Sequence, residues 1–291
     1  MMIMFKRLFF LRTAVGSLAY ALRRYPSLLL GGLPAFVIFL CYIVCREKIL
    51  SSAPSVYGDL PYMFIIGLVV LNFVSIICVS QMMTVWSRIA DARFDNVPLG
   101  VIVSMSFKEF WRMALPLFPV WIILSSLLYF LLTFFVSAYK LFSISGQTTA
   151  FIGIAWMLVI MWPLLTVLTA KLLFLPTFAL EAPKPNFFTG IIASWNYVTI
   201  NVLKHHWLAF LILTFPVILG VILPFTLMQE NLLYLVKGRN ALMIQELGAA
   251  ILWLIGPLGL AAAQRLNMIL VSEFNKEISR LAQKQNGNTN D

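Results

Sequence analysis

The chain has 291 residues, of which 61% are hydrophobic and 11% are charged, and its mean hydropathy is +0.93. A soluble globular domain is about half apolar and about a quarter charged, so this composition excludes an ordinary soluble protein and indicates a chain that lies in lipid. The formal net charge of +10 is first a signal of membrane topology, and we expect no nucleic-acid partner.

Apolar runs long enough to cross a bilayer follow one another along the chain, since about 20 such residues span its hydrocarbon core. The segment before them, residues 1–26, mixes basic and apolar residues and lacks the apolar centre of a signal peptide, so we expect it to stay on the membrane surface. The three cysteines (Cys41, Cys45 and Cys78) make no disulfide framework and are expected to be small apolar residues of membrane helices. Six spans are predicted, at 27–44, 63–85, 115–136, 150–174, 207–228 and 248–269.

Basic residues are divided unevenly between the two sides of these spans. Most of the 21 Lys and Arg residues fall in segments on one side, and the loops of the other side hold only Arg46, Lys48, Lys140, Lys237 and Arg239. The positive-inside rule therefore places both termini in the cytoplasm.

The sequence resembles itself at a period of about 90 residues, the kind of spacing that marks a structural repeat. When residues 91–107 are laid on 181–197 without a gap, Asp91 falls on Glu181 and Ser104 on Ser194. The N-terminal Ser17 fits the same frame. We predict three parallel repeats at 5–90, 91–180 and 181–272, followed by a cytoplasmic tail at 273–291 whose end is disordered.

Each repeat is expected to open with an amphipathic helix in the headgroup layer. In the third copy, Asn186 is the expected N-cap. An apolar stripe and a polar stripe then recur at helical spacing. The apolar stripe comprises Phe188, Ile191, Ile192, Trp195, Thr199 and Val202, and the polar stripe Ser194, Tyr197, Asn201 and Lys204.

The two histidines of the chain are adjacent, in the stretch "KHHWLAF". Neighbouring side chains on a helix diverge by roughly 100°, so a shared metal ion is disfavoured. We interpret Lys204, His205, His206 and Trp207 as an anchor at the membrane interface, with a titrating or ligand role for histidine as the alternative. The basic residues Arg23, Arg24 and Arg112 are expected beside them at inner-leaflet headgroups, where they either bind anionic lipid or only set topology.

Motifs of known enzyme classes are missing from the sequence, so no catalytic, cofactor or metal residue is predicted. Polar residues inside the predicted spans are then the best functional candidates. They either form interhelical hydrogen bonds and snorkel to the surface, or line a polar pocket open to the cytoplasmic leaflet. The candidates are Asn72, Gln81, Ser125, Thr169, Lys171 and Arg265.

The stretch "LPTFALEAPKPNFFTGIIASWNYV", residues 175–198, combines a proline-containing apolar run, an acid and a surface helix with a Ser-aromatic pair. In this stretch, and in its general plan, the chain resembles a loose group of six-helix bacterial inner-membrane proteins. The group includes the membrane domain attached to some glycerophosphodiester phosphodiesterases. The resemblance implies a bacterial inner-membrane location and a role near lipids, and it carries over no catalytic residue.

The sequence thus predicts an all-α polytopic membrane protein, a single membrane domain in which six transmembrane helices form three parallel hairpin repeats, each preceded by an interfacial helix. The expected function is that of a non-catalytic, lipid-associated scaffold or accessory subunit. Its expected partners are membrane lipids, in particular anionic ones, and a protein in the membrane. The alternatives are a transporter of a small or lipid-like solute through the centre of the repeats, and a membrane enzyme that acts on lipid.

Overall fold

The computed structural model describes residues 6–51, 62–144, 163–222 and 239–287. Within these ranges the chain is almost entirely helical and forms no strand, which confirms the all-α class. A further helical stretch covers 163–172. The elements are α1 (Arg7–Arg23), α2 (Tyr25–Ser51), α3 (Tyr62–Ala90), the 3-10 turn η2 (Ala92–Phe94), α4 (Leu99–Ile144), α6 (Leu175–Glu181), α7 (Thr189–Tyr197), α8 (Ile200–His205), α9 (Trp207–Val217), the π-helical turn η3 (Ile218–Ile222) and α12 (Arg239–Gly287).

Four helical segments of the described residues are long and apolar enough to cross a membrane: Tyr25–Cys45, Phe73–Ala90, Pro163–Glu181 and Met243–Lys276. They overlap the first, second, fourth and sixth predicted spans, so the chain is compatible with a multi-pass membrane protein. The third predicted span lies within α4, and its side chains beyond 123 fall outside the described ones. The fifth corresponds to a shorter apolar helix, Trp207–Val221. Six spans therefore stay a prediction.

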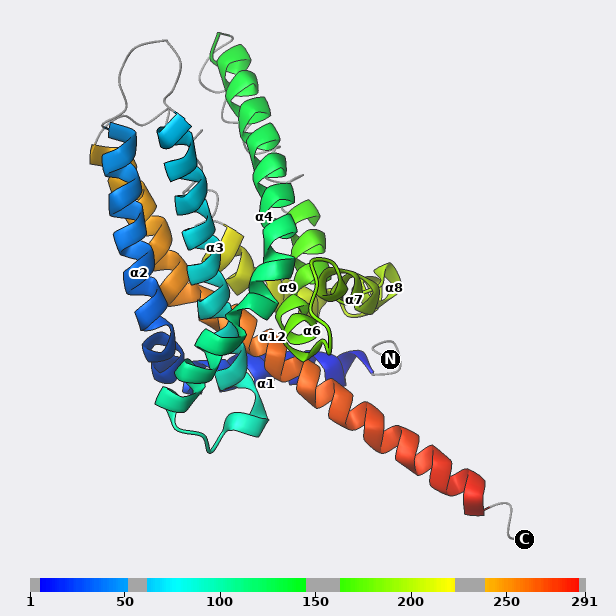
Figure 1. Ribbon diagram of the computed structural model, residues 1–291. Helices are drawn as coiled ribbons and strands as arrows, with labels where there is room; N and C mark the ends of the chain where they lie inside the picture. The colour runs from blue at the N-terminus through cyan, green and yellow to red at the C-terminus, as the bar shows by residue number, and fades with distance from the viewer. Residues whose placement is uncertain (1–5, 52–61, 145–162, 223–238, 288–291) are drawn as a thin grey trace.

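Helices α2, α3 and α12 stand side by side, and α4 packs against α3 (Figure 1). Trp86 of α3 lies fully buried between them, and its Nε1 donates a hydrogen bond of 3.1 Å to the Leu28 carbonyl of α2. Glycines make room for the indole: a Cβ at Gly32 would lie 2.8 Å from Nε1, and one at Gly256 would lie 3.3 Å from the ring. Lipid provides no hydrophobic drive between helices, so such close contact is what holds them together.

The α9–η3 segment crosses α12 with its backbone in direct contact. A Cβ at Gly220 would collide with the backbone of Gly256, and one at Gly259 would lie 2.5 Å from a Val217 methyl group. Pro216 lies inside α9 just before the π-helical turn. A proline removes one helical hydrogen bond, and a π turn is a common local accommodation in such helices.

Helix α1 runs crosswise at the base of the bundle (Figure 1) and contacts α12 and α9. Its buried face consists of Phe10, Ala14, Ser17 and Ala21. Small residues at this spacing allow the helix to lie close against its neighbours. The chain then turns at Arg24 and enters α2, whose second residue is Pro26, a position that tolerates proline because no helical partner is lost there.

Positions aligned by the predicted repeat differ in their surroundings. Ile102 is 4% exposed and Ile192 is 56% exposed, while Ser104 is exposed and Ser194 is buried. In α4 the fully buried serine is Ser106 instead. The gapless alignment does not preserve burial, and the three repeats stay a prediction. Residues 273–287 of the predicted tail continue α12 as helix, which projects away from the bundle (Figure 1); residues 288–291 lie outside the described ranges.

Candidate functional site at the base of the bundle

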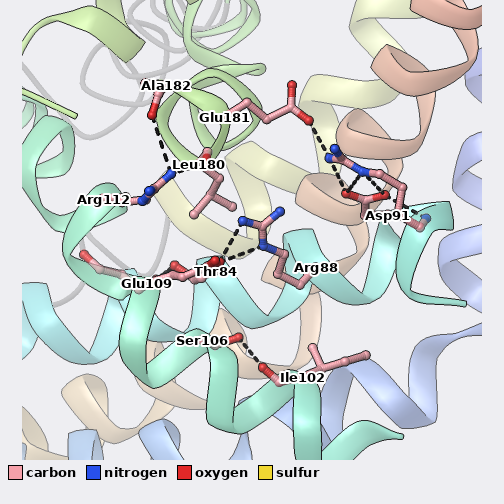
Figure 2. Close-up of polar contacts among 12 residues, drawn as sticks. Thr84, Arg88, Asp91, Ile102, Ser106, Glu109, Arg112, Leu180, Glu181 and Ala182 are labelled. Carbon is pink, nitrogen blue, oxygen red and sulfur yellow. Dashed lines mark hydrogen bonds and ion pairs between the residues drawn. The ribbon is translucent and has the colours of Figure 1, made fainter. Parts of the chain in front are cut away.

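Arginine and glutamate join α3 to α4 near the base of both helices (Figure 2). The Arg88 Nε and Nη2 donate to the same Glu109 oxygen at 2.9 and 2.7 Å. The two side chains are 11% and 26% exposed, respectively. The guanidinium also lies 5.3 Å from the centroid of the Phe94 ring. Charge-assisted bonds of this kind are about twice as strong as neutral ones, so the pair fixes these two helices relative to each other.

The carboxylates of Asp91 and Glu181, both labelled in Figure 2, approach the same guanidinium group, which belongs to Arg93 in the turn between α3 and α4. Asp91, which is fully buried, receives a bond of 2.6 Å from the guanidinium and also caps η2 by accepting the Arg93 backbone N–H at 2.9 Å. Glu181 at the end of α6 accepts from the same guanidinium at 2.5 Å. The hydrogen bonds that Arg93 donates to Asp91 raise the pKa of Arg93 above its already high value. Asp91 and Glu181, which the predicted repeat aligns with each other, thus meet at one arginine.

Arg112 of α4 points at the C-terminal end of α6. Its Nη1 donates to the carbonyls of Leu180 at 3.1 Å and Ala182 at 3.5 Å. The last carbonyls of a helix have no helical partner and carry partial negative charge, so a cation stabilises them. The structure places this predicted headgroup residue in a contact between helices.

Arg23 and Arg24, adjacent in sequence, have different environments. Arg24 pairs with Asp95 at 2.9 Å, and the Tyr20 hydroxyl donates to the same carboxylate oxygen at 2.7 Å. Arg23 is exposed and makes no ion pair with any residue that the structure describes. Arg265 of α12 lies over the Tyr20 ring, with its guanidinium carbon 4.3 Å from the centroid.

An open pocket of about 580 Å³ lies between α1 and α12. Three arginines line it, two from α1 and one from α12. Aromatic, small and hydroxyl residues complete the wall. The lining residues are Phe9, Arg12, Thr13, Gly16, Ala19, Tyr20, Arg23, Arg265 and Ile269.

The histidine pair straddles the break between α8 and α9. His206 is buried and stacks on Phe10 of α1 at 4.1 Å between ring centroids, rather than facing headgroups as the anchor interpretation expected. Lys204 and Trp207 are exposed and His205 is half-buried, which suits the anchor. Within the described ranges, no group of three or more His, Cys, Asp or Glu side chains is placed to hold a metal ion.

Lys171 lies inside the fold instead of snorkelling to the surface. Its Nζ donates to the Trp195 carbonyl at 3.1 Å and lies 5.1 Å from that ring's centroid, while Ser194 donates to the Lys171 carbonyl at 2.7 Å. The lysine thereby attaches α7 to the helix that ends before α6. Gln81 and Thr169 are buried. Asn72 lies in α3 and Ser125 in α4, but both side chains fall outside those that the structure describes.

Sequence reasoning missed the ion pairs of Arg88 with Glu109 and of Arg93 with Glu181 because these two acids come from other helices. The pair of Arg93 with Asp91, two residues earlier in the same turn, was within its reach. Sequence reasoning also missed Thr177, whose hydroxyl donates to the Gln264 carbonyl oxygen. Ser80 and Ser87 of α3 and Asp91 just after its end recur at helical spacing, and this polar pattern could have pointed to this region.

The base of the bundle is thus a set of arginine contacts in which Asp91, Asp95, Glu109 and Glu181 each accept from an arginine. Carboxylates held in this way by guanidinium groups position the helices and turns that carry them. No protein-family model, no curated protein and no solved structure matches the chain.

Proposed function

We propose that the chain is a non-catalytic integral protein of the bacterial inner membrane, with both termini in the cytoplasm, that associates with lipid of the cytoplasmic leaflet as a scaffold or an accessory subunit. In this proposal six spans form three parallel hairpins, each introduced by an interfacial helix. The proposal is supported by the large apolar side chains that α1 and α7 expose.

Apart from Phe10 of α1, helices α1 and α7 bury small or polar residues, and they expose several large apolar residues. Leu8 of α1 is 78% exposed and Phe188, next to α7, is 60% exposed, while Ser17 and Ser194 are fully buried. A soluble protein rarely exposes contiguous apolar surface of this kind, whereas a helix on a bilayer places it among the lipid chains. This inverted burial is the observation that carries the proposal.

Cations lie beside these apolar faces. Arg12 and Arg23 of α1 are exposed, as are Lys204 and its neighbour Trp207 at the α8–α9 break. Basic side chains next to apolar ones are typical of helices that rest on an anionic leaflet, where each cation contributes about 1 kcal/mol.

A nitroxide spin label placed at Leu22 or Ile192 tests the proposal in reconstituted vesicles. Both side chains are more than half exposed, so the labels should be reached by oxygen, which concentrates in lipid, more readily than by a water-soluble nickel complex. A label at Lys276, exposed on the part of α12 that projects from the bundle, should show the reverse. Equal nickel access at all three positions would contradict an interfacial location of α1 and α7.

Transport of a small solute is the second candidate, and one observation favours it. Buried polar atoms on Ser80, Gln81 and Ser87 of α3 and on Asn267 of α12 have no hydrogen-bond partner. Buried groups of this kind are normally satisfied by protein or by water. A cysteine at Ser87 that reacts with a charged thiol reagent would reveal an aqueous path and favour transport, and an unreactive one would favour the scaffold.

A further inference from the structure

We infer that the pocket between α1 and α12 binds the phosphate of an anionic phospholipid headgroup, and this inference rests on the proposed association with lipid. The pocket combines three features that such a ligand requires: unneutralised guanidinium groups, an apolar wall beside them, and access from the face of α1 that carries exposed apolar residues.

The first feature is charge without a counter-ion. Arg12 and Arg23 make no ion pair with any described residue, and Arg265 makes none either. The carboxylate of Asp95, which holds Tyr20 at one side of the pocket, accepts from Arg24 and from the Tyr20 hydroxyl. Three cations therefore face one cavity without an acid in its lining. Guanidinium groups suit phosphate because their N–H groups match its oxygens in pairs.

The second feature is the preorganisation of Arg265. Its guanidinium lies against the Tyr20 ring, and the Tyr20 hydroxyl is fixed by Asp95 at 2.7 Å. Its Nη1 is a buried donor without a hydrogen-bond partner. Leaving such a donor unpaired is costly, and because the Arg265 side chain lines the open pocket, an anionic ligand there could satisfy it.

The third feature selects lipid over a soluble phosphate. Phe9, Ala19 and Ile269 contribute apolar wall to the pocket. Leu8, Val15 and Leu22, each two turns apart, form an exposed apolar stripe on the same helix. Arg12 follows Leu8 by one turn and Arg23 lies three turns further along, so both cations border that stripe. A headgroup held here would leave its acyl chains along the stripe.

The other pockets of the described residues fit this ligand less well. The larger one, near the start of the projecting part of α12, is lined by Arg93 and Glu181, which neutralise each other, together with Lys276. The smaller one, at the α8–α9 break, has Arg7 and the two histidines in its lining. Only the α1–α12 pocket, among those that the structure describes, brings several unpaired arginines together.

The test measures lipid affinity of the full chain in detergent by native mass spectrometry, with phosphatidylglycerol and phosphatidylcholine of equal chain length as probes. The double variant Arg12→Gln/Arg23→Gln removes two pocket cations. The double variant Lys108→Gln/Lys184→Gln removes the same charge from exposed positions outside the pocket. Removal of each pocket cation should weaken phosphatidylglycerol binding about fivefold, so the pocket pair should cost about 25-fold, and the control pair far less.

A steric variant tests the same site without a change of charge. A Cβ at Gly16, which lines the pocket, meets nothing within 4 Å. Gly16→Phe should therefore fold normally and fill the pocket, and phosphatidylglycerol affinity should drop about as far as in the arginine pair. Gly100 has equally open surroundings outside the pocket, so Gly100→Phe should leave affinity unchanged.

The outcomes separate the inference from the proposed function. Equal losses in the pocket pair and the control pair would overturn the pocket and leave general surface attraction to lipid in place. Displacement of phosphatidylglycerol by glycerol phosphate at equal concentration would overturn the lipid assignment in favour of a soluble phosphate. A wild-type protein that binds both lipids equally would overturn the pocket and the proposed preference for anionic lipid together.

Discussion

Removal of either partner of the Arg88–Glu109 pair should destabilise the protein, and the two single variants should differ. Glu109→Leu leaves Arg88 behind at 11% exposure, and Arg88→Met leaves Glu109 behind at 26% exposure. Breaking a buried pair costs about 3–5 kcal/mol because an unpaired charge remains in a medium of low polarity. After a discount for partial exposure, we expect a loss of about 3 kcal/mol for Glu109→Leu and about 2 kcal/mol for Arg88→Met.

The assay is unfolding in mixed micelles of detergent and sodium dodecyl sulfate, followed by loss of tertiary structure. The double variant Arg88→Met/Glu109→Leu should recover most of the loss, because no unpaired charge remains and the two side chains can pack against each other. Lys276→Met is the control: its pair with Glu273 is exposed on both sides, so it should change stability by less than about 0.5 kcal/mol. The reasoning fails if the single variants cost no more than Lys276→Met, or if the double variant is as unstable as the sum of the singles.

Three further predictions follow from buried side chains and from topology. Tyr197→Phe should stabilise the protein by about 1 kcal/mol, because the buried hydroxyl has no hydrogen-bond partner while the ring contacts with Phe174 and Phe178 are kept. Burial also raises the pKa of Tyr197 above its usual value. Ionisation of this phenol therefore leaves the free energy of unfolding unchanged below pH ~10 and lowers it at more alkaline pH, where the unfolded chain ionises first. Tyr197→Phe should flatten that alkaline loss, as measured by unfolding at several pH values. Gly32→Ala should cost about 1–3 kcal/mol, since the new methyl group collides with the Trp86 indole, whereas Gly16→Ala should be neutral or stabilising in the same unfolding assay. A cysteine at position 145 should be labelled by an impermeant reagent from outside intact cells and one at position 286 should not; the opposite pattern would refute the predicted topology.

The helical class and the membrane character could be predicted from the sequence because they depend on composition and on the length of apolar runs. The start of the third surface helix could be predicted in part: the N-cap of α7 is Phe188 rather than Asn186, but the Asn186 side chain accepts from the backbone N–H groups of Phe188 and Thr189 at 2.9 and 2.6 Å. Which face of that helix is buried could not be predicted from the sequence. The spacing predicts a polar stripe with Ser194 and an apolar stripe with Ile192; in the structure Ser194 is buried and Ile192 is exposed, as the proposed location at a lipid surface would favour.

The break in the same region also depends on tertiary contacts. A continuous helix was expected across 186–204, yet it ends at Tyr197, and Thr199 caps a new helix by accepting the Val202 N–H at 3.3 Å. His206 is buried because Phe10, almost two hundred residues earlier in the chain, stacks on it. The arginine network could not be predicted for a related reason: Arg93 and Glu181 come from different elements, and periodicity within one segment carries no information on such pairs.

Native mass spectrometry of the protein released from its own membrane, with identification of bound lipid, tests the central claim most directly. Association with the cytoplasmic leaflet predicts an anionic phospholipid retained in fixed ratio, and its loss when Arg12 and Arg23 are both replaced by glutamine. A clean protein mass without lipid would contradict the claim, and the unpaired polar groups along α3 would then make transport the better account.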